Sequence, residues 1–233
     1  MRIFNSESSQ YLVLAGLALG IILLAGIISS LDTLYFRAYF GILNPFLTVL
    51  SICILGIILL SYLLSKGWFL IYKKENKKGL LISFTLASLL GLIMMIVDTI
   101  VILPKEMNVL FPYSLLFYPV MGFVVQIIFH VLPLTILLII FTKTVKESSY
   151  AHILWFCILV VATIEPVYQI LAGFTDTYSI WVTAYIAIHI FIINLFELMI
   201  FKRYDFVSMY LFRITYYLFW HIGWGYLRLK LLF

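Results

Sequence analysis

Long apolar runs, separated by short polar connections, dominate the sequence. Each run reaches the roughly 20 residues that an α-helix needs to cross a hydrocarbon core about 30 Å thick. Pro45 lies near the start of the second run, so a short leading segment is expected to be split from the helix there. The pattern predicts seven membrane-spanning helices, at 11–30, 41–64, 79–103, 114–142, 151–173, 180–201 and 207–228.

Composition agrees with this pattern. The chain is 65% hydrophobic and 11% charged, with a mean hydropathy of +1.16, which excludes a water-soluble domain. The connections leave no room for a soluble insertion, so residues 1–233 are expected to form a single integral membrane domain. The predicted fold class is an all-α, polytopic transmembrane helix bundle of seven helices, or eight with a re-entrant or short extra helix. Gly16 and Gly20 form a G-x-x-x-G pair that favours close packing within the bundle or to a partner helix.

Lysine and arginine predict the orientation, because cytoplasmic loops retain positive charge during insertion. With a cytoplasmic amino terminus, four of the fifteen basic residues fall outside, at Arg37, Lys105, Arg228 and Lys230, and Arg213 lies within the last run. The other ten are cytoplasmic: Arg2, Lys66, Lys73, Lys74, Lys77, Lys78, Lys143, Lys146, Lys202 and Arg203. The sequence therefore predicts a multi-pass integral membrane protein with its amino terminus in the cytoplasm.

The segment 66–78 combines aromatic and aliphatic residues with four lysines near its end. This composition is typical of a short helix in the headgroup region, or of a positively charged anchor at the membrane surface. The net charge of +5 thus indicates membrane topology and anionic lipid. No basic face alternates with aromatic residues in a soluble segment, so the expected partner is the lipid bilayer and nucleic acid is not expected.

Ionisable side chains inside the apolar runs are the candidate functional groups. Such groups are costly in lipid, so they usually face the bundle interior and mark a working site. His130, Glu165, His189 and His221 are the main members of this set. Counted from the flank of each run, at a helical rise of about 1.5 Å per residue, all four fall roughly 20 Å from one membrane face. We expect them to share one layer.

Two predicted helices carry a polar pair beside a proline. Gln126 and His130 are four residues apart and precede Pro133, and Glu165 and Gln169 have the same spacing around Pro166. Side chains four residues apart share a helix face, and each proline predicts a kink. The pairs either form part of a site or satisfy backbone groups freed by the kinks.

The last run carries Arg213, Tyr217 and His221 on one stripe, followed by Gly225 one turn later. Tyr217 is expected to orient His221, and Gly225 leaves room for another group to approach. The alternative is an aromatic packing face with an arginine that extends its charged end to the membrane surface.

Other polar residues are weaker candidates. Asp98 falls near the outer end of the third run, where an interfacial position is expected. Glu197 lies near Lys202 and Arg203, which are its expected partners, and Asn194 precedes it by three residues. His189 matches the layer in depth, and it also fits a packing role.

A carboxylate beside imidazoles can remove a proton from a water molecule in a low-dielectric cavity. This chemistry makes Glu165, His221 and His130 the candidate catalytic residues. The same three side chains form a known type of ligand set for a divalent metal such as zinc. Five further residues are expected to bind a ligand or to support the catalytic residues: Gln126, Gln169, Tyr217, Arg213 and His189.

Three segments, Val125–His130, Glu165–Gln169 and His221–Gly225, together suggest a family. Their order resembles the motifs E-E-x-x-x-R, F-x-x-x-H and H-x-x-x-N of the CPBP intramembrane proteases (CAAX processing and bacteriocin processing, also called Abi). The resemblance covers roughly the second half of the chain. It implies a membrane-embedded endopeptidase that acts on membrane-associated peptides.

The chain departs from those motifs at most functional positions. Only His221 stands where the family has the same residue. Gln126 replaces a glutamate and His130 the arginine, while Glu165 and Gln169 stand in place of phenylalanine and histidine. The chain would thus be a divergent member in which Glu165 supplies the carboxylate.

Three functions remain open at this stage. The first is a peptidase that depends on glutamate and histidine, or on a metal. The second is a non-catalytic protein of the same ancestry, an immunity or scaffolding factor, whose polar layer fixes helix register or binds a partner helix. The third is a transporter or substrate-binding membrane subunit, because polar groups near the bilayer midplane beside broken helices also describe a binding site.

Overall fold

A computed structural model describes residues 2–31, 40–104, 107–144, 150–172 and 178–233. These residues form helices and the turns between them, with no strand in the described ranges. The all-α fold class is confirmed. Arg37, Lys105 and Lys146, which the orientation argument counts, lie outside the described residues.

Seven helical runs follow one another in the described residues, and six of them are long and apolar enough to cross a membrane. The seventh run, at the end of the chain, is less apolar than the other six. The fourth and seventh runs are each interrupted by a π-helix. The bounds are α1 Arg2–Leu31, α3 Pro45–Ser65, α4 Lys77–Val101, α5 Ser114–Val125 with η2 Gln126–Val131 and α6 Leu132–Thr144, α7 Tyr150–Leu171, α8 Ile180–Arg203, and α9 Phe206–Tyr217 with η4 Leu218–Trp224 and α10 Gly225–Leu231.

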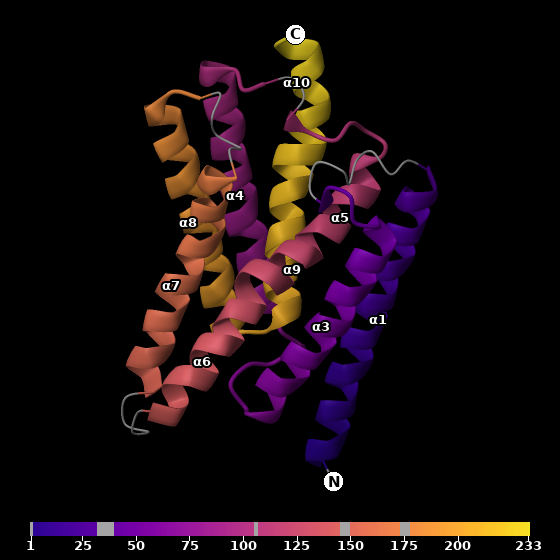
Figure 1. The fold of residues 1–233 in the computed structure, drawn as a ribbon, viewed down its shortest axis with the longest axis vertical. Coiled ribbons are helices and arrows are strands. Elements are labelled where there is room, and N and C mark those ends of the chain that lie inside the picture. Colours follow the sequence, from indigo (N-terminus) through magenta and orange to yellow (C-terminus); the bar gives the residue numbers. More distant parts are fainter. Residues whose placement is uncertain (1, 32–39, 105–106, 145–149, 173–177) are drawn as a thin grey trace.

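The runs alternate in direction, so the two ends of the chain lie at opposite ends of the bundle (Figure 1). The run α9–η4–α10 is central and packs against α4, α5 and α8. The run α5–η2–α6 crosses the bundle obliquely, from α1 and α3 at one side to α7 at the other. This oblique helix and the central run bring their polar residues together inside the bundle.

The second helix begins at Pro45 and not at residue 41. Proline fits the first turn of a helix, where its missing N–H needs no partner. The Asn44 side chain caps the helix by accepting a hydrogen bond from the Leu47 N–H at 3.0 Å. The predicted break at Pro45 is thus the helix start itself.

Residues 66–76 form no helix, which corrects the expectation of a short interfacial one. The segment folds back against the start of α9 instead. Its carbonyls at Leu70 and Ile71 accept hydrogen bonds from the N–H groups of Phe206 and Val207. The Asp205 carboxylate accepts from Ser208 N–H at 2.7 Å, and from Lys73 N–H at 3.0 Å. These polar contacts explain why the segment is not a regular helix.

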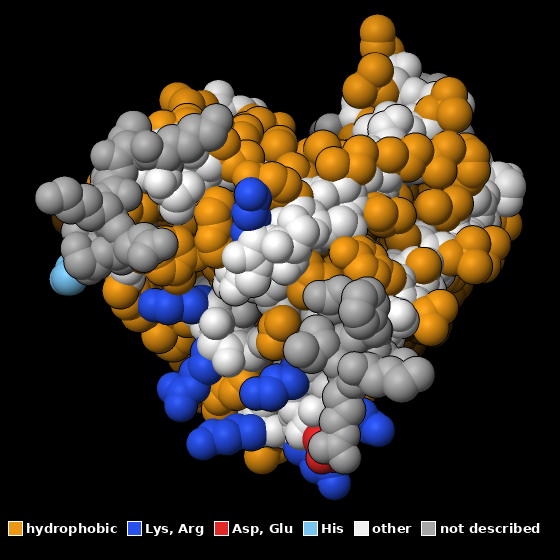
Figure 2. Space-filling model, turned by 90° about the horizontal axis from the view of Figure 1, so that it is seen from below, with side chains coloured by type: hydrophobic (Ala, Val, Ile, Leu, Met, Phe, Trp, Pro, Cys, Tyr) orange, Lys and Arg blue, Asp and Glu red, His pale blue; other side chains and the backbone are white. Residues whose placement is uncertain are grey.

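Lysine and arginine side chains gather on the end of the molecule that holds this segment (Figure 2). The described members are Lys66, Lys73, Lys74, Lys77, Lys78, Lys202 and Arg203. Their position on one end agrees with the charge bias found in the sequence.

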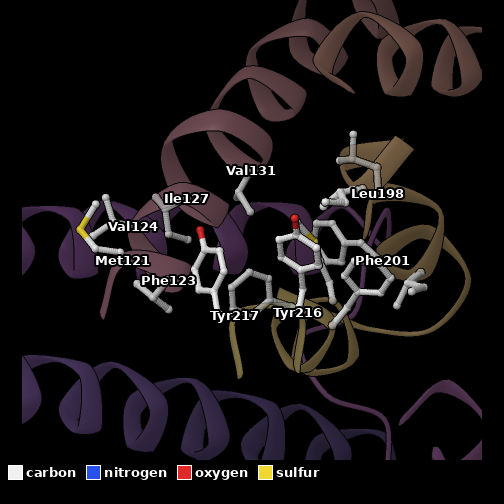
Figure 3. Packing of buried hydrophobic residues seen from close by; sticks show 14 of the residues in the cluster. Met121, Phe123, Val124, Ile127, Val131, Leu198, Phe201, Tyr216 and Tyr217 are labelled. Carbon is white, nitrogen blue, oxygen red and sulfur yellow. The ribbon is translucent and has the colours of Figure 1, made fainter. Parts of the chain in front are cut away.

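Aromatic side chains fill the core between the central run and its neighbours. Tyr216 and Tyr217 of α9 lie between η2, at Ile127 and Val131, and α8, at Leu198 (Figure 3). A glycine permits close approach where helices cross, because a Cβ at Gly56 would lie 2.8 Å from the Ile127 side chain. Gly16 and Gly20 of α1 have no such neighbour in the described chain and face outward. The pair therefore does not pack within the described bundle, and packing against a partner helix stays a prediction.

Candidate functional site

Arg213 of α9 lies at the centre of a polar cluster enclosed by helices, with 2% of its surface exposed. Its Nη2 donates hydrogen bonds to Glu197 Oε2 at 2.7 Å, Glu165 Oε2 at 3.0 Å and Asn194 Oδ1 at 3.0 Å. Nη1 donates to Glu165 Oε1 at 3.4 Å. One guanidinium thus joins α7, α8 and α9. We call the following residues the Arg213 cluster: Gln126, His130, Glu165, Asn194, Glu197 and Arg213.

His130 of η2 lies against the same carboxylate. Its Nε2 is 3.8 Å from Glu197 Oε2, and both side chains are fully buried. Asn194 also faces His130, and Gln126 faces Glu197. Neither of these two contacts has the geometry of a hydrogen bond. Side chains from four elements, η2, α7, α8 and α9, therefore meet around Arg213 and Glu197.

Several buried polar atoms of the cluster have no hydrogen-bond partner among the described residues. They are Gln126 Oε1 and Nε2, His130 Nδ1 and Nε2, Glu197 Oε1 and Arg213 Nε. Buried polar groups are almost always paired, and each one left unpaired costs about 1–3 kcal/mol. Their concentration at one place is what a site for a polar molecule requires.

The formal charges of the cluster do not cancel. Glu165 and Glu197 bring two negative charges, whereas Arg213 brings one positive charge. A net charge is expensive to hold in a low-dielectric interior. A proton shared between His130 and Glu197, or a cationic group of a ligand, would balance it.

The π-helix η2 presents Gln126 and His130 to the cluster. At its end the Leu132 N–H donates to the Ile127 carbonyl, five residues back. Pro133 follows and has no N–H to donate, so the hydrogen-bond ladder changes register here. A kink was predicted beside Pro133, and the structure has a π-turn there. Single π-turns inside α-helices occur frequently at functional sites.

Glu165 and Gln169 form the predicted pair on α7, where Gln169 Nε2 donates to Glu165 Oε1 at 3.3 Å. Both oxygens of Glu165 therefore accept hydrogen bonds, from Gln169 and from Arg213. Pro166 lies inside a continuous α-helix. Gln169 is half-buried, at the outer edge of the site.

A second buried ion pair joins Asp98 of α4 to Arg228 of α10, in the last helical run. Arg228 Nε donates to Asp98 Oδ2 at 2.6 Å, and Arg228 Nη2 donates to Asp98 Oδ1 at 3.0 Å. Trp224 Nε1 and the Leu103 N–H complete the carboxylate's hydrogen bonds. The remaining guanidinium donors reach the Leu103 and Pro104 carbonyls. Asp98 lies near the end of α4, as expected, but its side chain is buried in the bundle with an exposed fraction of 0%. Its expected position at the membrane interface stays a prediction.

His221 has a separate polar neighbourhood. Its Nδ1 lies 2.6 Å from Asn108 Oδ1, and its ring stacks on Tyr118 with centroids 4.6 Å apart. Tyr217 stands between the two regions, with its ring 5.0 Å from the His221 ring and 5.7 Å from the Arg213 guanidinium. Gly225 makes room for Asn108, whose Nδ2 would lie 3.2 Å from a Cβ there.

The single predicted layer is thus divided in the described structure. His130 and Glu165 meet through Glu197 and Arg213, whereas His221 pairs with Asn108. His189 packs between Tyr185 and Tyr216, with ring centroids 5.7 Å and 5.9 Å away. Counting from the helix flanks assumed upright helices that start at one level, and the oblique run α5–η2–α6 breaks that assumption.

Two expectations about charged residues are wrong. Arg213 does not extend its charged end to the membrane surface, since it is buried and paired with carboxylates. Glu197 pairs with Arg213, and its expected partner Lys202 lies over the Trp155 ring. Buried opposite charges on neighbouring helices were a signal that could have found this pairing.

A metal set of His130, Glu165 and His221 finds no support in the geometry. Within the described ranges, no group of three or more His, Cys, Asp or Glu side chains could hold a metal ion. The cluster instead mixes carboxylates with the cationic Arg213, and a guanidinium this close opposes a second cation. The donor set does not fit zinc.

Comparisons with protein-family models, with curated proteins and with solved structures give no match.

Proposed function

We propose that the protein is an intramembrane hydrolase that acts on membrane-associated peptides, with the Arg213 cluster as its active site. The observation that supports this most directly is the contact between His130 and Glu197, at 3.8 Å, inside a group of unpaired polar atoms. A carboxylate and an imidazole this close can both contact one water molecule that lies beside them. The relation to the CPBP family stays part of this proposal.

Glu197 suits the role of general base better than Glu165. Glu197 Oε1 has no hydrogen-bond partner among the described residues, whereas both oxygens of Glu165 accept hydrogen bonds. A base must have a free lone pair within reach of the proton that it takes. Glu165 then becomes the residue that holds Arg213 in place.

The other members of the cluster have distinct tasks in this proposal. Arg213 keeps the Glu197 carboxylate oriented through Oε2. Glu197 takes one proton from the water as the water oxygen bonds to the peptide carbonyl carbon, and His130 relays this proton to the leaving amine nitrogen as the C–N bond breaks. The unpaired Nε2 of Gln126 supplies an N–H donor for the oxyanion that forms when water attacks a peptide carbonyl.

A second candidate is a non-catalytic membrane protein, an immunity or scaffolding factor. The observation that favours it is that Arg213 already engages both carboxylates within the bundle. In that case the cluster fixes how α7, α8 and α9 pack. Glu197→Gln would then affect folding and partner binding, with no hydrolysis to lose.

The test uses the full-length protein in liposomes with quenched-fluorescent peptides that carry one apolar span of about 20 residues. Wild type is expected to cleave the peptides, and Glu197→Gln and His130→Gln are each expected to slow cleavage by about 10²–10⁴-fold, the usual contribution of an acid–base group. His189→Gln is the matched histidine control, because His189 lies among tyrosines outside the cluster.

Melting temperature is measured on each variant, so that loss of cleavage is compared at equal folded fraction. Equal cleavage by wild type and Glu197→Gln would overturn the assignment of the base. Absence of cleavage by every protein, with Glu197→Gln lowering the melting temperature, would favour the scaffolding candidate.

The orientation is part of the same proposal. The end of the bundle with the basic face of residues 66–78 and 202–203 lies in the cytoplasm, together with the amino terminus. Cysteine substitutions at Lys74 and Lys230, probed with a membrane-impermeant thiol reagent in sealed cells, are expected to react only at residue 230.

A further inference from the structure

The basic face at one end of the bundle carries cations without counter-charges among the described residues (Figure 2). It consists of Lys66, Lys73, Lys74, Lys77, Lys78, Lys202 and Arg203. None of these seven side chains forms an ion pair with a described carboxylate. The nearby Asp205 is buried, and it already accepts hydrogen bonds from two backbone N–H groups and the Asn76 side chain. The positive charge is therefore available to an anionic partner.

The two parts of the basic face, at residues 66–78 and 202–203, are joined in the fold. Phe69 of the first part packs against Phe201, with ring centroids 4.3 Å apart, and Lys202 follows Phe201 directly. The Asp205 carboxylate also accepts a hydrogen bond from the Lys73 N–H at 3.0 Å. The field of the lysines in the first part thus acts at the end of α8.

Lys202 lies where this charge adjoins the apolar surface of α7. Its Nζ is 3.8 Å from the centre of the Trp155 ring. Trp155 is 41% exposed, and Leu159, one turn farther along the same face of α7, is 47% exposed. Both α7 and α8 are long and apolar enough to cross a membrane, and tryptophan is enriched at the level of the lipid headgroups. In a membrane, the face with Trp155 and Leu159 contacts acyl chains just below the cation.

We propose that the basic face binds an anionic phospholipid, with the negative headgroup beside Lys202 and an acyl chain along Trp155 and Leu159. Clusters of basic residues next to a membrane span attract anionic lipids. A phospholipid of net negative charge matches both the cations and the adjoining apolar surface, whereas an acidic segment of a soluble protein matches only the cations. This proposal does not depend on hydrolysis by the Arg213 cluster.

The experiment uses the full-length protein in detergent micelles with two photoreactive lipids. Phosphatidylglycerol is anionic and phosphatidylcholine has no net charge, and both carry the same acyl chains with a diazirine. Crosslinks to α7 residues 152–162 are mapped by mass spectrometry. Phosphatidylglycerol is expected to label this peptide at least about fivefold more, the effect of one cation beside an anionic headgroup. Added salt is expected to reduce the preference because ions screen exposed charges.

Three variants locate the interaction. Lys202→Gln is expected to lower labelling by phosphatidylglycerol about fivefold and to leave labelling by phosphatidylcholine unchanged, which shows that the fold is retained. Lys202→Arg keeps the charge and is expected to keep the preference. Lys230→Gln is the matched control, because Lys230 Nζ also lies over an aromatic ring, Tyr226 at 4.5 Å, but at the opposite end of the bundle (Figure 1). Its α7 labelling is expected to equal that of wild type.

Equal labelling of α7 by the two lipids, or an unchanged preference in Lys202→Gln, would overturn the proposal. A soluble polyglutamate peptide is the third probe. If this peptide binds wild type and not Lys202→Gln, while the two lipids label α7 equally, the basic face serves an acidic protein partner and the lipid proposal is wrong.

Discussion

Two groups of buried charges lie along the last helix, and they are built differently. Around Asp98 and Arg228 the charges cancel, and every carboxylate oxygen and guanidinium nitrogen has a partner. Around Arg213 the carboxylates outnumber the cation, and Glu197 Oε1 and Arg213 Nε have none among the described residues. The first group is complete on its own, whereas the second needs another polar molecule or a proton.

This difference separates structure from function within one helix. A complete pair between α4 and the last helix holds the bundle together, as buried polar groups do when all are satisfied. An incomplete group costs stability, and such a cost persists in membrane proteins mainly at working sites. The two groups should therefore respond differently to substitution.

The largest effect on stability is expected at the complete pair. Asp98→Asn leaves the Arg228 charge buried without a counter-charge, and breaking such a pair costs about 3–5 kcal/mol. Equilibrium unfolding in mixed micelles measures this loss. The double variant Asp98→Leu/Arg228→Leu is the control, since replacing both charges by apolar groups is expected to recover most of the stability. A double variant as unstable as Asp98→Asn would contradict this account.

An intermediate effect is expected when each arginine is replaced by lysine. All three guanidinium nitrogens of Arg228 donate hydrogen bonds, and Arg228→Lys loses this planar group. In Arg213, one of the three nitrogens, Nε, has no hydrogen-bond partner among the described residues. We expect a loss of about 1–3 kcal/mol in each case, larger for Arg228→Lys. Both are measured by the same unfolding assay. A larger loss for Arg213→Lys would mean that the cluster is the tighter structure.

The smallest effect is expected at the basic end, outside both groups. Asp205 caps α9 by accepting from Ser208 N–H, and it also accepts from Asn76 Nδ2 at 2.8 Å. Asp205→Ala is expected to cost about 0.5–2 kcal/mol, as for other helix caps. Asp205→Asn is the milder control. A loss as large as that of Asp98→Asn would place a third essential polar group here.

Most of the fold could be predicted from the sequence because lipid imposes a simple rule. Apolar runs of sufficient length must be helical, and the seven predicted runs correspond to the seven described. The predicted start at residue 41 differed because Asn44 and Pro45 provide a cap and a first turn. The segment after Lys66 differed because contacts with α9, distant in sequence, decide its shape.

The site was predictable only in part. His130, Glu165, Gln126 and Gln169 were selected because polar residues in lipid carry a high cost, and the structure brings them to one region. Their link through Glu197 and Arg213 was not predicted. The spacing of residues along the sequence shows neither the tilt of a helix nor how far a long side chain extends. Asn108 was not predicted because it lies in a loop, where polar residues are common and do not indicate a site.

The most direct test of the central claim is the cleavage rate per folded molecule of Glu197→Gln, measured beside its free energy of unfolding. Glu197→Gln removes the excess negative charge of the Arg213 cluster, so the account predicts unchanged or higher stability together with cleavage reduced by about 10²-fold or more. A variant that loses stability while each folded molecule cleaves at the wild-type rate would contradict it.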